Sequence, residues 1–464
     1  MLFSSPAFFV FFAVYFTLHL VIPARWRLYL IIAGSTVFYA WWKLEYVWLP
    51  YALMAIAYFG VIWMMRAKLE PARKRRAAAV IALLFVPLLF FKYTNFVYND
   101  VLGALTGGGK VLDLALPLGV SFVTFTLTAY IVDIYRGKFS TQARPQTVLA
   151  YVLFFPHLIA GPILRPIELI PQLEHPRPRK SLMPVAALAV FTAGLVKKLV
   201  FADTIAGLVD SIYAHAGTAS APEALLAMYG FSVQIYCDFS GYTDMAIGLA
   251  MLLGVRLPNN FAQPYCADSI VDFWRRWHKT LSFWLRDYLY IPLGGNRDGK
   301  VYEIRNIMIT MALGGLWHGA SWTFVIWGIL HGAAVSSVHA ARKLLRWSWL
   351  DRVPRWVGVL VTFNFVTLVW VFFRAPGLGH ATDLLRAVVI GGWAGTPQLV
   401  SAHLFEIMLI ALFFVFHRYD DHRRVRIAVA RLRPEIVWPL LLAQWALAIT
   451  VSQGSSAKFI YFDF

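Results

Sequence analysis

Apolar stretches long enough to cross a lipid bilayer recur along the whole sequence, with short polar or basic segments between them. A helix needs about 20 consecutive, mostly apolar residues to span the hydrocarbon core of a membrane. Such stretches cover residues 4–22, 28–46, 47–65, 77–92, 116–134, 183–202, 225–255, 306–340, 355–374, 403–417 and 435–452. The pattern predicts an all-α polytopic membrane protein with about 11 transmembrane helices.

The segments between these stretches predict one orientation, because membrane proteins concentrate Lys and Arg in their cytoplasmic loops. The basic segment Arg66–Arg76 is therefore expected in the cytoplasm. Counting spans from it places Arg25, Arg27 and the basic segment Tyr135–Gln146 on the same side, which agrees with their charge. Both the N-terminus and the C-terminus are then expected outside.

The region 148–181 departs from this regular alternation of spans and loops. Its apolar part, Phe154–Pro166, is broken by prolines and a glycine, and the basic segment His175–Lys180 that follows is again expected inside. Irregular backbone at membrane depth is tolerated only where protein or a water-filled cavity covers it. We therefore predict a re-entrant segment that enters and leaves on the same side.

The stretch from Leu199 to Val255 contains no Lys or Arg, and Asp203, Asp210 and Glu223 predict an acidic outer loop within it. A return span, or a broken pair of helices, is expected across 225–255. We find no linker, low-complexity tract or clear internal repeat. The sequence predicts one membrane domain over 1–464, with N-terminal helices in 1–115, a core in 116–340 and C-terminal helices in 341–464.

Composition supports the membrane assignment, since 59% of residues are hydrophobic and only 14% are charged. The net charge of +18 is explained by basic cytoplasmic loops, so no nucleic-acid partner is expected. Cys237 and Cys266 have neither metal nor redox spacing, and no pair of histidines has the spacing of a zinc site. No P-loop, dinucleotide fingerprint or nucleophile elbow is present, so no metal or bound cofactor is predicted.

The densest candidate site lies in Asp272–Lys300, where Trp and Leu recur at three- and four-residue spacing and predict an amphipathic helix. His278 is its titratable member, and cationic side chains surround it. One interpretation is an interfacial helix that binds anionic lipid headgroups through Arg, Lys and Trp. The other is a cytoplasmic vestibule that receives a phosphate-bearing ligand. The residues expected to bind substrate are Arg275, Arg276, Trp277, Lys279, Asn296 and Arg297 of this segment, together with Trp317, Asp238 and Asp244 of the two segments described next.

A second candidate is His318 in the apolar segment Gly314–Trp322, next to Trp317. Burying a titratable ring in apolar surroundings costs free energy, unless hydrogen bonds satisfy its nitrogens or the ring takes part in a reaction. A structural histidine and a reaction centre are both possible, and the glycines on either side allow a backbone or a substrate to approach closely. His331, on the same apolar segment, is a weaker candidate.

Two acids in the long apolar run, Asp238 and Asp244, form a third candidate. Acids at membrane depth are rare and usually face a cavity or a partner. Their spacing of six residues does not put them on one helical face. Either they contact substrate, or each caps a broken helix or pairs with an arginine.

Taken together, these segments resemble the membrane-bound O-acyltransferase family, most of all its bacterial branch of alginate O-acetylation membrane subunits. The resemblance runs in order from about residue 116 to the last residue, and the start of the chain is also similar. The matching pieces are Leu116–Phe125, Tyr130–Gly137, Phe154–Pro166, Asp238–Gly248, Phe273–Gly299, Gly314–Trp322, Val369–Ala375 and Lys458–Phe464.

The resemblance implies a helical fold around a tunnel through a bacterial inner membrane. It also implies that His318 of the Trp-His-Gly motif is catalytic, with His278 of the Arg-Trp-His motif as the second signature histidine. The expected donor is cytoplasmic acetyl-CoA, and the expected partner is a periplasmic acetyltransferase that modifies an exopolysaccharide such as alginate. His318 would act either as a general base or through an acyl-imidazole.

Three alternatives to this function remain. The first is that the acetylated polymer is cellulose or another cell-surface polymer. The second is that the chain transfers D-alanine from a carrier protein to teichoic acid. The third alternative is a non-enzymatic transport or export subunit whose histidines line a path.

Overall fold

The computed structural model is all-helical in the part of the chain that it describes, which is residues 1–464 without 104–113, 141–142, 160, 179–181, 345–352, 453–456, 458 and 461–464. The chain forms two compact units that are not consecutive in sequence. Unit 1 comprises residues 1–191 and 245–258, and unit 2 comprises residues 192–244 and 259–464. Two long helical stretches, at 184–214 and 221–252, pass from one unit to the other.

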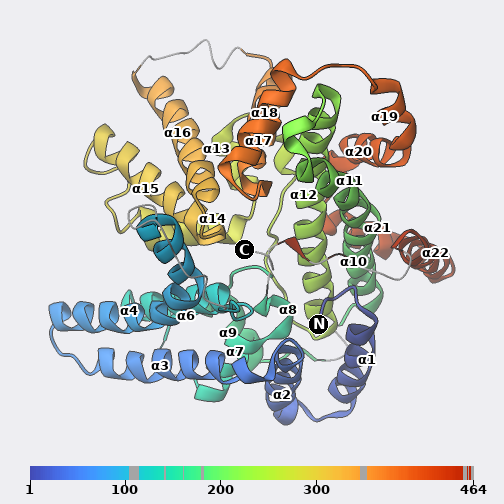
Figure 1. The fold of residues 1–464 in the computed structure, drawn as a ribbon. Coiled ribbons are helices and arrows are strands. Elements are labelled where there is room, and N and C mark those ends of the chain that lie inside the picture. Colours follow the sequence, from blue (N-terminus) through green and yellow to red (C-terminus); the bar gives the residue numbers. More distant parts are fainter. Residues whose placement is uncertain are drawn as a thin grey trace. The chain divides into compact units, whose positions relative to one another are not determined.

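Unit 1 contains the N-terminal helices and the short helices of the irregular region. Prolines begin several of these helices, where a missing N–H costs nothing. The helices are α1 (Pro6–Val21), α2 (Arg27–Ala40), α3 (Trp48–Met65), α4 (Glu70–Asn95), α6 (Val120–Tyr135), α7 (Pro145–Leu153), α8 (Phe155–Leu158) and α9 (Pro166–Glu174), and a π-helical turn, Phe96–Leu102, continues α4 (Figure 1).

Unit 2 carries the predicted chemistry, and the helices α15 and α16 pack against each other along their length. Its helices are α11 (Asp203–Ala214), α13 (Ile270–Arg276), α14 (Lys279–Leu285), α15 (Lys300–His318), α16 (Trp322–Leu344), α17 (Arg355–Arg374), α18 (Leu378–Ile390), α19 (Thr396–Ala402), α20 (Leu404–Phe416), α21 (His422–Arg431) and α22 (Pro434–Ser452). The helices α10 (Pro184–Val196) and α12 (Ala221–Leu252) belong to both units.

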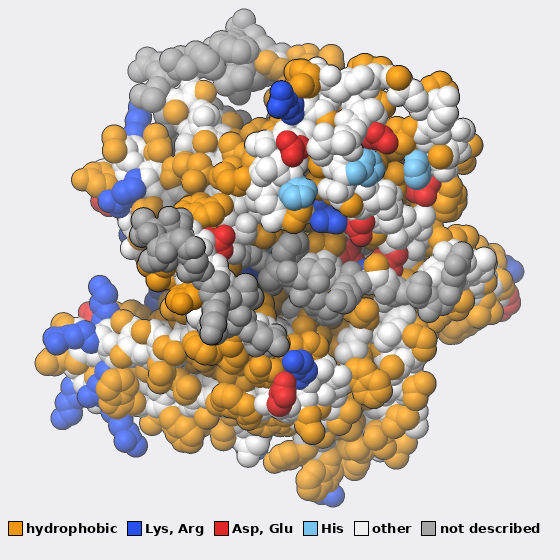
Figure 2. Space-filling model, viewed as in Figure 1, with side chains coloured by type: hydrophobic (Ala, Val, Ile, Leu, Met, Phe, Trp, Pro, Cys, Tyr) orange, Lys and Arg blue, Asp and Glu red, His pale blue; other side chains and the backbone are white. Residues whose placement is uncertain are grey.

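The chain is a multi-pass membrane protein, but the described residues contain fewer full-length spans than the sequence predicts. Six helices are long and apolar enough to cross a membrane, or seven if the bent pair α19 and α20 is one span. The expected number of about 11 is not reached, in part because α1 and α6 are only 16 residues long. Large hydrophobic side chains such as Val389 and Val21 are exposed, and hydrophobic side chains cover much of the face in Figure 2. In a membrane, lipid tails cover such exposed hydrophobic side chains.

One other prediction needs correction. Asp203 and Asp210 do not lie in a loop, because α10, the π-helical turn Lys197–Ala202 and α11 form one helical stretch through residues 184–214. Of the two alternatives for 225–255, the structure has the single helix, which ends at Leu252. The irregular region breaks into the short helices α7, α8 and α9. Arg144, just before this region, and His175, near its end, line one pocket of unit 1.

Candidate functional site

His318 is the last residue of α15 and lies in a cage of aromatic rings. The ring centroids of Trp317, Trp327 and Phe373 lie 5.0, 5.2 and 5.2 Å from that of His318, all edge-on. The histidine is 4% exposed. The cage therefore shields the imidazole from solvent.

The glycines near His318 serve the packing of α15 against α16. A side chain at Gly315 would collide with the carbonyl oxygen of Phe324, and one at Gly328 would collide with that of Met311. The two helix backbones therefore approach each other closely at these positions. Gly319 likewise lies against the ring of Phe324. Of the two expected uses of these glycines, the structure shows the close approach of another part of the protein, which fills the space beside them.

His278 interrupts the amphipathic helix that the sequence predicts. Its backbone is left-handed, with φ of +40°, so α13 ends before it and α14 begins after it. The backbone N–H of Lys279 donates to the Asn260 carbonyl oxygen at 2.9 Å and fixes this turn. The predicted single helix is therefore two short helices, and the break directs the ring of His278 into the interior, where the residue is fully buried.

The hydrogen bonds of Asn260 determine which nitrogen of His278 carries the proton. Asn260 Oδ1 accepts bonds from the backbone N–H of Thr280 at 3.2 Å and from its hydroxyl at 3.0 Å. The backbone donor identifies this amide atom as oxygen. His278 Nδ1, 3.1 Å away, must therefore be the N–H donor. His278 Nε2 is then a buried lone pair, with no hydrogen-bond partner among the residues that the structure describes.

Protonation of His278 is disfavoured as well. The residue lies outside the candidate membrane spans, and burial lowers its pKa to about 3. The neutral ring is thus the form present at physiological pH. A neutral histidine with one fixed N–H and one lone pair is equipped to accept a proton or a hydrogen bond at Nε2.

Trp317 joins the two signature histidines in one cluster of unit 2. Its ring centroid lies 6.5 Å from that of His278 and 5.0 Å from that of His318. Phe239 closes the other side of His278, edge-on at 4.7 Å. Residues 40 positions apart in the sequence therefore share one aromatic neighbourhood.

The cationic residues next to His278 differ in their surroundings. Arg275 is exposed and lines a pocket of about 330 Å³, whose walls include Trp274, Phe283 and Ile307. Arg276 instead points back along α13, where its Nε donates to Asp272 Oδ2 at 2.8 Å. Arg275 is thus the cation that is placed to meet a ligand.

The remaining predicted substrate-binding residues are more scattered. Trp277 is 1% exposed and packs against Phe273 and Trp370. Burial lowers the pKa of the half-buried Lys279, and Arg423 nearby lowers it further. Asn296 and Arg297 are exposed in the turn before α15.

Three pocket residues lie outside the set that the sequence suggested as substrate-binding. Arg286, Tyr290 and His339 line the same pocket as Arg275. His339 Nδ1 lies 3.0 Å from Glu303 Oε1, which joins α16 to α15. Arg286 and Tyr290 belong to a π-helical turn, Arg286–Tyr290. The basic character of Arg286 was visible in the sequence, but the turn that presents it was not.

The buried acids Asp238 and Asp244 pair with lysines, where the structural interpretation anticipated arginine. Asp244 Oδ2 lies 2.6 Å from Lys197 Nζ, and Asp238 Oδ1 lies 2.7 Å from Lys198 Nζ. Both lysines lie on the π-helical turn after α10. The signal for this pairing was two adjacent lysines inside an apolar span, which need acidic partners.

His331 occupies an aromatic environment without polar neighbours. It is fully buried between Trp327 at 4.6 Å and Trp274 at 5.1 Å, measured between ring centroids. Neither ring nitrogen has a hydrogen-bond partner among the described residues. Its position beside Trp327 places it behind the cage of His318.

Comparison with known proteins adds independent information. Residues 140–378 match the MBOAT, membrane-bound O-acyltransferase family. A probable alginate O-acetylase of Azotobacter vinelandii is 37% identical over 97% of this chain and 88% of its own length. A peptidoglycan O-acetyltransferase of Helicobacter pylori is 37% identical over 84% of this chain and 80% of its own length. A teichoic acid D-alanyltransferase of Bacillus subtilis is 28% identical over 57% of this chain and 70% of its own length.

Proposed function

Because the chain belongs to the membrane-bound O-acyltransferase family and is an O-acyltransferase, we propose that it moves acetyl groups from cytoplasmic acetyl-CoA toward a cell-envelope polysaccharide. Because the chain belongs to a family of O-acyltransferases, the alternative of a non-enzymatic export subunit is rejected. The observation that carries the proposal is the cluster of His318, Trp317 and His278 in unit 2.

His318 is the catalytic residue of this proposal. Its neutral imidazole takes the proton from the acceptor hydroxyl while the hydroxyl oxygen attacks the thioester carbonyl, and the sulfur leaves as the thiolate of coenzyme A. In the other route, an imidazole nitrogen attacks the thioester carbonyl first, coenzyme A leaves as its thiolate, and the acceptor hydroxyl then cleaves the acyl-imidazole and frees the imidazole. Both routes need the neutral ring, whose nitrogen lone pair either takes the proton or attacks the carbonyl carbon.

His278 acts beside it through Nε2. Since Asn260 holds the Nδ1 proton, Nε2 accepts a hydrogen bond from the acceptor hydroxyl or from a water, and so orients the group that reacts. The two histidines are held in different ways. The side chain of Asn260 orients His278, whereas His318 lies in an aromatic cage.

The donor binds at the pocket lined by Arg275 and Arg286. Coenzyme A carries phosphates, which guanidinium groups bind through charge-assisted hydrogen bonds. Its pantetheine arm is less polar and suits the apolar side chains Phe283 and Ile307 of the same pocket. Arg276 and Lys279 are secondary in this arrangement, because Arg276 is engaged by Asp272.

The acceptor is an exopolysaccharide such as alginate, reached through a periplasmic acetyltransferase partner, as the similarity to the alginate O-acetylases suggests. The similarity to a peptidoglycan O-acetyltransferase makes peptidoglycan the second candidate. D-alanyl transfer is less favoured, since that relative shares less sequence over less of the chain.

The test uses cells in which the gene is deleted and restored as wild type, as His318→Ala or as His331→Phe. Ester-linked acetate is measured separately on secreted polysaccharide and on purified peptidoglycan, and membrane expression of each variant is checked by immunoblot. We expect His318→Ala to abolish acetylation of one polymer and His331→Phe to keep it. Full acetylation with His318→Ala would overturn the catalytic assignment.

A further inference from the structure

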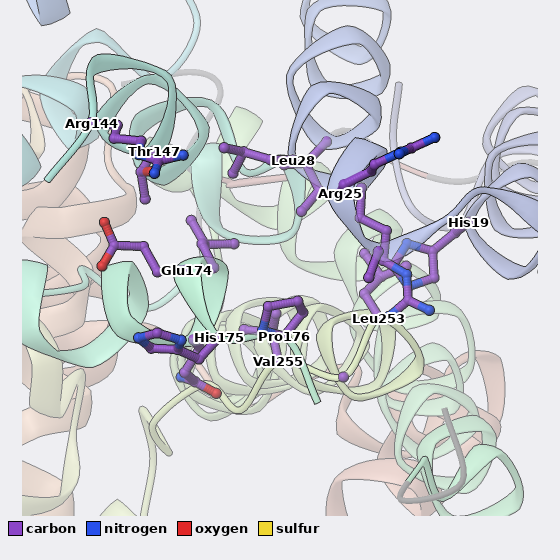
Figure 3. A pocket seen from close by; sticks show the side chains of 16 residues that line it. His19, Arg25, Leu28, Arg144, Thr147, Glu174, His175, Pro176, Leu253 and Val255 are labelled. Atoms are coloured by element: carbon purple, nitrogen blue, oxygen red, sulfur yellow. The ribbon is translucent and has the colours of Figure 1, made fainter. Parts of the chain in front are cut away.

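Unit 1 contains a pocket that the proposed acyl transfer does not use. Its volume is about 490 Å³, within the usual range for small-molecule sites. Figure 3 shows that its labelled side chains surround an open space, with Arg144 and Glu174 on one side and Arg25 and His19 on the other. They come from α1, the start of α2, the start of α7, the end of α9 and the segment after α12.

The charge of the lining favours an anion. Arg25, Arg27 and Arg144 line the pocket, and Glu174 is the acidic residue that faces them, so these groups carry a net charge of +2. Guanidinium groups bind phosphate through pairs of parallel hydrogen bonds, which makes a phosphate group the best match among anions.

Part of the pocket interior is apolar. Ile31, Leu173, Leu253 and Val255 line it, and each is less than 9% exposed. A cationic rim above an apolar floor suits an amphiphile, whose charged group stays at the rim while its apolar part covers the floor. A free inorganic anion would use only the rim.

One wall of the pocket is held rigid by hydrogen bonds. The side chain of Gln172 accepts from the backbone N–H of Arg256 at 2.9 Å and donates to the carbonyl oxygen of Arg256 at 3.0 Å. Gly254 turns the chain there with a φ of +80°, a conformation that favours glycine. The end of α9 is therefore fixed to the segment after α12 before any ligand binds, which lowers the ordering cost of binding.

The basic residues come from segments that the sequence places on one side of the membrane. Arg25 and Arg27, the segment Tyr135–Gln146 and the segment His175–Lys180 are each expected in the cytoplasm, and the pocket brings residues of all three together. Because residues of these segments line one cavity, their positive charges are concentrated at one site.

We propose that this pocket binds the phosphate group of an anionic amphiphile, with the phosphate between Arg25, Arg27 and Arg144 and the apolar part on the floor. Two sources share this chemistry, an anionic phospholipid of the membrane and a soluble phosphate ester. The proposal is independent of the proposed acyl transfer, whose residues lie in unit 2.

The experiment uses the full-length protein in a neutral detergent and measures bound ligand by native mass spectrometry. The probes are phosphatidylglycerol, phosphatidylcholine, coenzyme A and inorganic phosphate. The test variant combines Arg25→Gln, Arg27→Gln and Arg144→Gln. The matched control removes the same number of charges from exposed positions at the end of α3 and the start of α4, as Arg66→Gln, Lys74→Gln and Arg75→Gln.

We expect phosphatidylglycerol to bind the wild type more tightly than phosphatidylcholine does, and the test variant to lose affinity by at least about tenfold while the control does not. If coenzyme A shows that loss and phosphatidylglycerol does not, the pocket is supported and its ligand is a soluble phosphate ester. Equal losses in test and control variants, or no loss for any probe, would overturn the proposal.

A second variant guards against a folding defect in the first. The combination Arg25→Lys, Arg27→Lys and Arg144→Lys keeps the charge and removes the guanidinium fork. It should bind phosphatidylglycerol with an affinity between those of the wild type and the glutamine variant. Affinity as low as that of the glutamine variant would also support the site and show that it needs the guanidinium geometry, whereas a folded glutamine variant with wild-type affinity would overturn the proposal.

Discussion

Lys197 is predicted to be essential for the stability of unit 2, because it is the cation shared by two acids. Its Nζ lies 2.6 Å from Asp244 Oδ2 and 3.0 Å from Asp420 Oδ1, and Tyr236 donates to Asp420 Oδ2 at 2.7 Å. The side chains of Lys197 and Asp244 are 14% and 11% exposed. Replacing Lys197 with Met leaves two carboxylates facing each other without a cation.

Removal of one partner from a buried ion pair typically costs about 3–5 kcal/mol. For a cooperative unit of the size of unit 2, that corresponds to a fall in apparent Tm of roughly 6–10 °C. Asp244→Asn has a much smaller expected effect, on the order of 1 kcal/mol, because Lys197 and Asp420 remain paired. The double variant should be more stable than Lys197→Met alone, since it removes one uncompensated charge.

The assay is thermal unfolding of the detergent-solubilised protein at one fixed scan rate, followed by tryptophan fluorescence. Lys74→Met, on the exposed start of α4, is the control for a lost surface charge. The reasoning is refuted if Lys197→Met unfolds within about 2 °C of the wild type, or if Asp244→Asn loses as much stability as Lys197→Met.

Three further predictions follow from the site. His278 remains neutral in the folded protein down to a pH of about 3, while in the unfolded chain it gains a proton below 6.5, so stability should fall by about 2 kcal/mol between pH 6.5 and 5. Melting curves should show this loss in the wild type and less of it in His278→Gln; equal losses would exclude His278 as the cause. Arg275→Gln should raise KM for the acyl donor about tenfold in a transfer assay, while Arg276→Gln, engaged by Asp272, should change it little; the reverse order would contradict the donor pocket. Gly328→Leu should lower the apparent Tm by at least several degrees, through a collision with α15 that costs about 1–3 kcal/mol or more, and an unchanged Tm would show that the helices separate freely.

The helical membrane fold was predictable because apolar length and basic loops follow directly from bilayer physics. The length criterion overcounted the spans, since short helices such as α1 and α6 are apolar but only 16 residues long. The acidic loop was mispredicted because an aspartate such as Asp203 is usually solvated. In the structure, Asp203 Oδ1 instead lies 2.7 Å from Lys198 Nζ. Sequence shows an unusual charge but does not show its distant partner.

The histidine cluster was only partly predictable. The motifs around His278 and His318 indicated both positions, and periodicity suggested a continuous helix through His278. That helix breaks because Asn260, 18 residues earlier, fixes both the backbone and the ring of His278. A contact of this kind depends on tertiary packing, so no local pattern indicates it. The same limit applies to the glycines near His318, whose close neighbours belong to α16.

The central claim is that the buried imidazole of His318 carries out the acyl transfer. The most direct measurement is the rate at which the purified protein consumes labelled acetyl-CoA, by transfer or hydrolysis, in wild type, His318→Ala and His331→Phe. A general base typically contributes about 10²–10⁴ in rate. We expect the rate of acetyl-CoA consumption to fall at least about a hundredfold in His318→Ala and to stay near the wild-type rate in His331→Phe. Equal activity of wild type and His318→Ala would contradict it.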